Sequence, residues 1–264
     1  MMSLPESCAR TRYDHGRFRV VSRGYPAPAA IDRQGELIGN PTNNRNMKSQ
    51  NTACNQLLER SMELADRLAP VIGQELKSQK PRFKIVRELC YLAMEHAESV
   101  RLLMRGGKFT SATAQLRTQY ETVVRPVWVR FSASETAVTK LIGGLTEEDL
   151  ARRAGNLPMA QEMLDHLAAS PGVPRRILRS LLGFRAEVLK ESNSAVHSGA
   201  HAIYRYRSGY PELLLVQLIQ ASNDLLIATA RLQAALSGSR AQREELDLIG
   251  VEFASCLPPF RTAA

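Results

Sequence analysis

Apolar residues recur at spacings of three and four along most of this chain from residue 51 onward, which is the repeat of an amphipathic α-helix. Only 6% of the residues are aromatic, and Leu and Ala are abundant among the 44% that are hydrophobic. Such side chains suit helix interfaces better than sheets. The sequence therefore predicts an all-α fold, an antiparallel bundle of four to five long helices with a small helical insertion.

Proline and glycine mark several helix ends. Pro81 suits the first turn of a helix that ends at Gly106-Gly107, and this tight corner turns the next helix back antiparallel to it. Pro70 is expected to bend or end the first helix, and Pro126 is expected to kink the third. The helices are expected over about residues 51–70, 81–105, 110–131, 174–207, 211–237 and 241–253.

The chain divides into a tail, one domain and a second tail. Residues 1–50 hold scattered prolines and charges without periodicity, so we expect a disordered N-terminal tail, with at most a short strand at 17–21. Met47 directly precedes the first helical pattern, and we hypothesise that translation starts there. Residues 51–255 are expected to form a single helical domain, with short helices in an insertion at 134–174, and residues 256–264 a loose C-terminal tail.

Cysteine usage and hydropathy indicate the compartment. The four cysteines lie far apart and form no CxxC pair, so neither a disulfide framework nor a zinc knuckle is indicated. The first thirty residues lack the apolar stretch of a signal peptide. The most apolar window, Leu213 to Leu236, predicts a core helix, because a bilayer centre would penalise its polar residues Gln217, Gln220, Asn223, Asp224 and Arg231. We expect a cytoplasmic protein with no membrane contact.

The net charge of +9 is compatible with an anionic partner such as RNA. The basic residues are spread along the chain without a run, and few aromatic residues lie among them. A solvated surface is the simpler interpretation of such a pattern.

Three polar residues, Asn193, His197 and His201, are spaced four apart inside the predicted helix over 174–207, which places them on one helical face. A zinc protease would carry an acid directly after the first histidine, and Ser198 stands there instead, so no metal is expected. His197 is a candidate general acid or base. The alternative is that the rings of His197 and His201 have no catalytic role and form hydrogen bonds within the protein.

A second polar cluster, Arg117, Glu121 and Arg125, follows the same four-residue step on the third helix. It is either a surface ion-pair ladder or a partly buried group whose arginines need acceptors. His96 on the second helix points to the same centre if the helices share one bundle.

The stretches Glu95-His96-Ala-Glu-Ser-Val-Arg101, Arg117-x-x-x-Glu121-x-x-x-Arg125-x-x-Trp128 and Asn193-Ser-Ala-Val-His197-Ser-Gly-x-His201 resemble a group of bacterial helical proteins of unknown function. The last stretch also resembles the Arg-Asn-x-x-x-His motif of HEPN domains, and the likeness covers about residues 51–237. HEPN ribonucleases cut RNA as dimers without metal, using the ribose 2′-hydroxyl as nucleophile. Asn193 and His197 match the motif, but Ser192 stands in the arginine position, and serine cannot clamp a phosphate.

The resemblance implies a HEPN-like homodimer, linked to defence or toxin systems, that binds or cleaves RNA without a cofactor. His197, Asn193 and Arg117 are its candidate catalytic residues, with Arg117 or Arg125 supplying the charge that Ser192 lacks. The alternative is a non-catalytic interaction module that binds a protein partner. In that module a buried polar network fixes the helix register, and its residues are Asn193, His197, Arg117, Glu121, Arg125, His201 and His96.

Overall fold

The computed structural model describes residues 30–31, 37–38, 52–142 and 157–259. Strands β1 (Ala30–Ile31) and β2 (Leu37–Ile38) pair antiparallel, with Ala30 opposite Ile38. They belong to a unit formed by residues 1–40, and the helices belong to a second unit formed by residues 41–264. The expected strand at 17–21, the helix after Thr146 and most of the tail before residue 51 lie outside the described residues.

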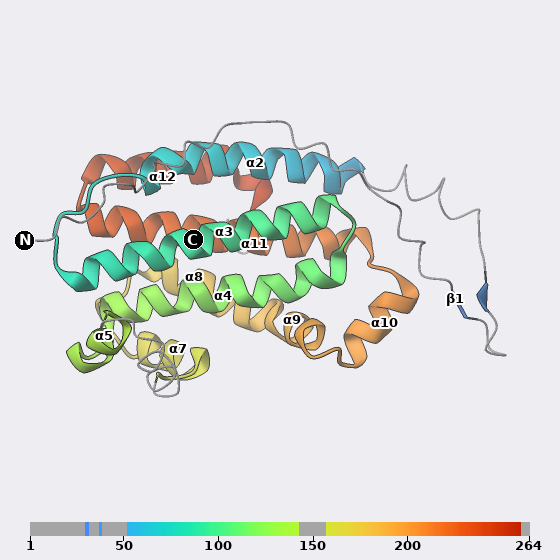
Figure 1. Ribbon diagram of the computed structural model, residues 1–264. Helices are drawn as coiled ribbons and strands as arrows, with labels where there is room; N and C mark the ends of the chain where they lie inside the picture. Colours follow the sequence, from blue (N-terminus) through green and yellow to red (C-terminus); the bar gives the residue numbers. More distant parts are fainter. Residues whose placement is uncertain (1–29, 32–36, 39–51, 143–156, 260–264) are drawn as a thin grey trace, which may run out of the picture. The chain divides into compact units, whose positions relative to one another are not determined.

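Long helices build the second unit, and the predicted all-α antiparallel bundle is confirmed (Figure 1). The chain turns from α3 into α4 at Gly106-Gly107, where Gly107 adopts a φ of 68° that favours glycine. Pro70 lies inside its helix, which continues to Ile72. Its helices include α2 (Thr52–Ile72), α3 (Pro81–Arg105), α4 (Phe109–Phe131), α11 (Glu212–Ser237) and α12 (Arg240–Glu252).

Helix α11 is the core helix of the bundle, because most of its side chains are buried, including polar ones such as Ser222 and Asn223. In the described part of the chain it is the one helix long and apolar enough to cross a membrane, judged by length and composition. Of its most apolar window, 72% is buried inside the protein, and the core helices of soluble proteins pass the same test.

Shorter helices complete the unit and position the candidate site. The described residues within 134–174 form short helices, and these lie below α4 in Figure 1. After it the chain forms three consecutive helices along α4. The shorter elements are α5 (Glu135–Ile142), α7 (Ala160–Ala168), α8 (Arg175–Glu187), α9 (Leu189–Val196), α10 (Ala200–Ser208) and the 3₁₀ turn η1 (Ala254–Cys256).

The expectation of one continuous helix over 174–207 is wrong. The helix is interrupted at Val188 and breaks fully after His197, where Ser198 has a φ of 50° and Gly199 is extended. The Ser194 hydroxyl accepts a hydrogen bond from the Ala202 backbone N–H at 3.2 Å. Ser194 thereby caps the first turn of α10 from outside that helix, which stabilises a new helix start at this point.

The expected loose tail from residue 256 is corrected over its first residues. Cys256, Leu257 and Pro258 are buried, and the Cys256 carbonyl accepts a hydrogen bond from the Asn223 side chain at 3.1 Å. The packed unit therefore extends past residue 255. Residues 260–264 lie outside the described residues.

Candidate functional site

Packing of α9 against α4 brings a histidine and an arginine together. Arg117 Nη1 lies 3.5 Å from His197 Nε2, although 80 residues separate them in the chain. Arg117 Nε donates a hydrogen bond to Glu121 Oε1 at 2.7 Å, one turn along the same helix. The carboxylate thus holds the guanidinium on the side of α4 that faces α9. We call Arg117, Glu121 and His197 the histidine–arginine cluster.

The cluster lies at the surface. The His197 side chain is exposed, and the side chains of Arg117 and Glu121 are 25% and 38% exposed. The expected buried polar network at these residues is therefore wrong, because all three side chains reach solvent. An exposed imidazole beside a guanidinium is accessible to an anionic ligand, as a buried pair would not be.

His201 does not share a face with His197, because the chain turns between them. His201 Nδ1 lies 3.4 Å from Glu191 Oε2, and Arg205 Nε donates to Glu191 Oε1 at 3.0 Å. Glu191 on α9 therefore holds two basic side chains of α10. The expected stack of Asn193, His197 and His201 is corrected by the break at Ser198.

Asn193 is partly buried on α9, and its backbone carbonyl accepts a hydrogen bond from the His197 N–H at 3.1 Å. Its side-chain Oδ1 is buried and finds no hydrogen-bond partner in the described part of the chain. Ser192, at the position of the HEPN arginine, is fully buried and its hydroxyl donates to the Leu189 carbonyl. A side chain at that position faces the bundle interior, so a phosphate-binding group there would be out of reach of a ligand.

The remaining predicted residues lie apart from the cluster. Arg125 is partly buried one turn beyond Glu121, and its Nε has no hydrogen-bond partner among the described residues. His96 Nδ1 lies 2.7 Å from Gln115 Nε2, so this pair links α3 to α4. The structure therefore brings Arg117, Glu121 and His197 together and leaves Arg125 and His96 with separate environments.

A buried polar network does connect the helices, but different residues build it. Gln119 on α4 and Ser222 on α11 form two reciprocal hydrogen bonds, and Asn223 donates to the Ser61 hydroxyl at 2.8 Å. All four side chains are buried. The sequence signal for this network was the run of polar residues that interrupts the apolar pattern of α11.

Sequence reasoning also missed the exposed side chains of α10. Tyr204 and Tyr206 are 59% and 63% exposed, and Ile203 is 48% exposed. The alternation Tyr204-Arg-Tyr-Arg207 was the available signal, because two aromatic residues alternate there with two basic ones.

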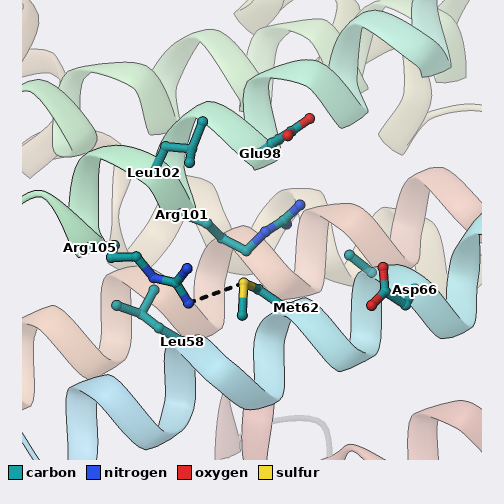
Figure 2. Close-up of a pocket in the computed structure, with 8 residues that line it drawn as sticks. Leu58, Met62, Asp66, Glu98, Arg101, Leu102 and Arg105 are labelled. Atoms are coloured by element: carbon teal, nitrogen blue, oxygen red, sulfur yellow. Dashed lines mark hydrogen bonds between the residues drawn. The ribbon is translucent and has the colours of Figure 1, made fainter. Parts of the chain in front are cut away.

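A groove of about 260 Å³ lies between α2 and α3, away from the predicted site residues (Figure 2). Arg105 donates to Met62 Sδ at 3.2 Å and to Glu59 at 2.7 Å. Burial lowers the pKa of Arg101, and the carboxylates of Glu98 and Asp66 act in the opposite direction. Two arginines and two carboxylates line the groove, so its formal charges balance.

In the described ranges, no group of three His, Cys, Asp or Glu side chains is arranged to hold a metal ion. The three cysteines described, Cys54, Cys90 and Cys256, are free and buried. Burial raises the pKa of each of these thiols above its ordinary value. They are therefore neutral packing side chains rather than nucleophiles.

The fold and the cluster define an all-helical bundle protein with an exposed histidine–arginine pair between two helices. The chain belongs to DUF6988, a family of unknown function, whose match covers residues 90–259. The match begins within α3 and takes in the whole histidine–arginine cluster and α10. No curated protein and no solved structure matches the chain.

Proposed function

We propose that this protein is a cytoplasmic HEPN-like homodimer that binds RNA at the surface of α4, α9 and α10 and cleaves it without a metal ion. The observation that carries the proposal is the exposed pair formed by Arg117 and His197, with 3.5 Å between Nη1 and Nε2. A guanidinium recognises phosphate, and an imidazole accepts or donates a proton near neutral pH. The two groups needed for phosphodiester cleavage thus lie side by side.

In the proposed reaction, His197 accepts the proton of a ribose 2′-hydroxyl, and the 2′-oxygen attacks the adjacent phosphorus. The bond from phosphorus to the 5′-oxygen breaks, and water supplies the proton to that leaving oxygen. The products are a 2′,3′-cyclic phosphate and a 5′-hydroxyl. Arg117, positioned by Glu121, stabilises the charge that develops on the phosphate oxygens.

The HEPN resemblance supports this assignment at two positions, Asn193 and His197. The arginine that HEPN nucleases carry before the asparagine is replaced by buried Ser192. Arg117 reaches the histidine from a neighbouring helix, so it supplies a positive charge from a different place in the chain. The proposal includes a role for this protein in defence or toxin systems, which the HEPN resemblance implies.

The test incubates labelled RNA with the full-length protein and with His197→Ala and Arg117→Ala, all in chelator. We expect wild-type cleavage and a loss of about 10²-fold or more for His197→Ala, the usual contribution of a general acid or base. His166→Ala, which removes an exposed histidine of α7, is the matched control. DNA of the same sequence must stay intact, because it lacks the 2′-hydroxyl. Cleavage at the wild-type rate by His197→Ala would overturn the proposal.

The competing function is a non-catalytic interaction module that binds a protein partner. Buried Ser192 favours it, since the phosphate clamp of the HEPN motif is missing at that position. In this case the wild-type protein would leave RNA intact under all conditions, and the exposed side chains of α10 would be the contact surface.

A further inference from the structure

Helix α10 leaves almost all of its surface exposed. Of its nine residues, all of them described, only Ala202 is buried. Tyr204 and Tyr206 expose more than half of their surface, and Ile203 nearly half. Figure 1 shows α10 beyond α9 at one end of the bundle. Three large apolar side chains are therefore exposed on this one short helix.

The helical repeat decides which of these side chains act together. Tyr204 and Arg207 are three residues apart, so they share the face that points away from buried Ala202. Tyr206 is two residues from Tyr204 and points to the other side of the helix. The Arg205 guanidinium lies 5.5 Å from the centroid of the Tyr204 ring. Tyr204 therefore has the Arg205 guanidinium beside its ring and shares a helix face with Arg207, whereas Tyr206 points elsewhere.

All the ionisable side chains of α10 other than its tyrosines are basic. The helix contains His201, Arg205 and Arg207 and no acidic residue. Glu191 of α9 contacts His201 and Arg205, and this carboxylate is only 16% exposed. Glu191 and Ser194 together hold α10 against α9, the helix that ends at His197 of the histidine–arginine cluster.

We propose that Tyr204 is a stacking site for a base of single-stranded RNA, and that Arg207 contacts the adjoining phosphate. This inference rests on the proposed RNA function and names its substrate as single-stranded. A tyrosine ring stacks on any unpaired base, and arginines beside it neutralise the backbone. A docked protein helix would need apolar side chains along one stripe, which the opposed tyrosines of α10 do not form. Bases in a duplex are already stacked and do not reach Tyr204.

The test measures binding of fluorescent twelve-nucleotide oligomers by anisotropy at several salt concentrations. Oligo-dT serves as the probe of stacking because it cannot be cleaved through a 2′-hydroxyl, and oligo-U and a duplex of the same length accompany it. We expect Tyr204→Ala to weaken binding of both single strands about tenfold, and Tyr204→Trp to restore it. Tyr206→Ala is the matched control, with the same side chain at a similar exposure on another side of the helix. Arg207→Gln should weaken binding and reduce its salt dependence.

The outcomes separate the two proposals. If the wild-type protein binds and cleaves oligo-U while Tyr204→Ala binds as tightly as wild type, the stacking site is overturned and the proposed cleavage stands. If Tyr204→Ala weakens binding but His197→Ala still cleaves, the stacking site stands and the proposed cleavage is overturned. If no single strand binds, and Tyr204→Ala instead abolishes self-association in light scattering, α10 is a protein interface and the stacking site is overturned. Circular dichroism melting of each variant confirms that it folds.

Discussion

Gln119 on α4 and Ser222 on α11 bind each other through two hydrogen bonds in the centre of the bundle. Gln119 Nε2 donates to the Ser222 carbonyl at 3.0 Å, and the Ser222 hydroxyl donates to Gln119 Oε1 at 2.7 Å. Both side chains are buried. Because a shift of either helix along the other would break both bonds at once, this pair fixes their register.

We expect Gln119→Leu to lower the free energy of unfolding by about 1–3 kcal/mol, because it leaves the buried Ser222 hydroxyl without an acceptor. Thr118→Leu is the control, since Thr118 is the adjacent residue on the same helix and is exposed. Urea unfolding followed by circular dichroism measures both. If Gln119→Leu and the wild-type protein are equally stable, then the hydrogen bonds between Gln119 and Ser222 contribute nothing to the free energy of unfolding.

Local signals predicted most of the fold. The three-four spacing, Pro81 and Gly106-Gly107 act within a turn or two of the chain, so α3 and α4 have nearly the predicted bounds. The break after His197 was missed because it depends on a contact across the turn, between the Ser194 hydroxyl and the Ala202 N–H. Helical periodicity continues through such a break and cannot reveal it.

The sequence predicted which residues form the candidate site better than it predicted how exposed they are. Four-residue spacing identified Arg117 and Glu121, and these two do form an ion pair. Their exposure depends on how far neighbouring helices extend, which no local pattern encodes. For the same reason the alternative interpretation placed a buried network at the predicted site residues, whereas Gln119 and Ser222 belong to the network that the structure shows.

Tyr120 and Phe184 join α4 to α8, with their ring centroids 4.6 Å apart and their planes 10° apart. Burial raises the pKa of Tyr120 to about 12, while Arg185 lowers it and the nearby carboxylates raise it. The folded protein thus resists deprotonation of a phenol that the unfolded chain releases near its ordinary pKa of about 10. The resulting stability is complete below pH 10 and is lost as the pH rises from about 10 to 12.

Tyr120→Phe removes this titration while keeping the stack. Between about pH 8 and about pH 11 we expect the wild-type protein to lose about 1 kcal/mol more stability than the variant. Urea unfolding at the two pH values measures the difference, and Tyr91→Phe, at an exposed tyrosine, is the control. Parallel losses in the wild-type protein and Tyr120→Phe would contradict the raised pKa.

Gly199 allows the close turn between α9 and α10. A Cβ at this position would lie 2.9 Å from Ser194 Oγ, the atom that caps α10. We expect Gly199→Ala to destabilise the protein by about 1 kcal/mol and to cost less in a Ser194→Ala background, where the clashing oxygen is gone. A double-mutant cycle by thermal unfolding measures this coupling. If the effects of the two substitutions are additive, then a clash between the new Cβ and Ser194 Oγ is not what destabilises Gly199→Ala.

Glu121 is a positioning residue for Arg117, and this role predicts a difference between two substitutions. Glu121→Ala releases the Arg117 guanidinium, so we expect RNA cleavage to fall about tenfold through lost orientation. Glu121→Gln keeps an oxygen that accepts the bond from Nε and should retain most of the activity. Stability should change by less than about 1 kcal/mol in either variant, because both partners of the ion pair are partly exposed.

Glu244→Ala is the matched control for Glu121→Ala, since it breaks an ion pair of the same spacing with Arg240 on α12, outside the site. Its cleavage rate and melting temperature should both equal those of the wild-type protein. If Glu121→Ala and Glu244→Ala cleave RNA equally fast, then the bond between Arg117 and Glu121 plays no part in catalysis. In that case the guanidinium needs no carboxylate to remain 3.5 Å from His197, and packing of α9 on α4 is enough to hold it there.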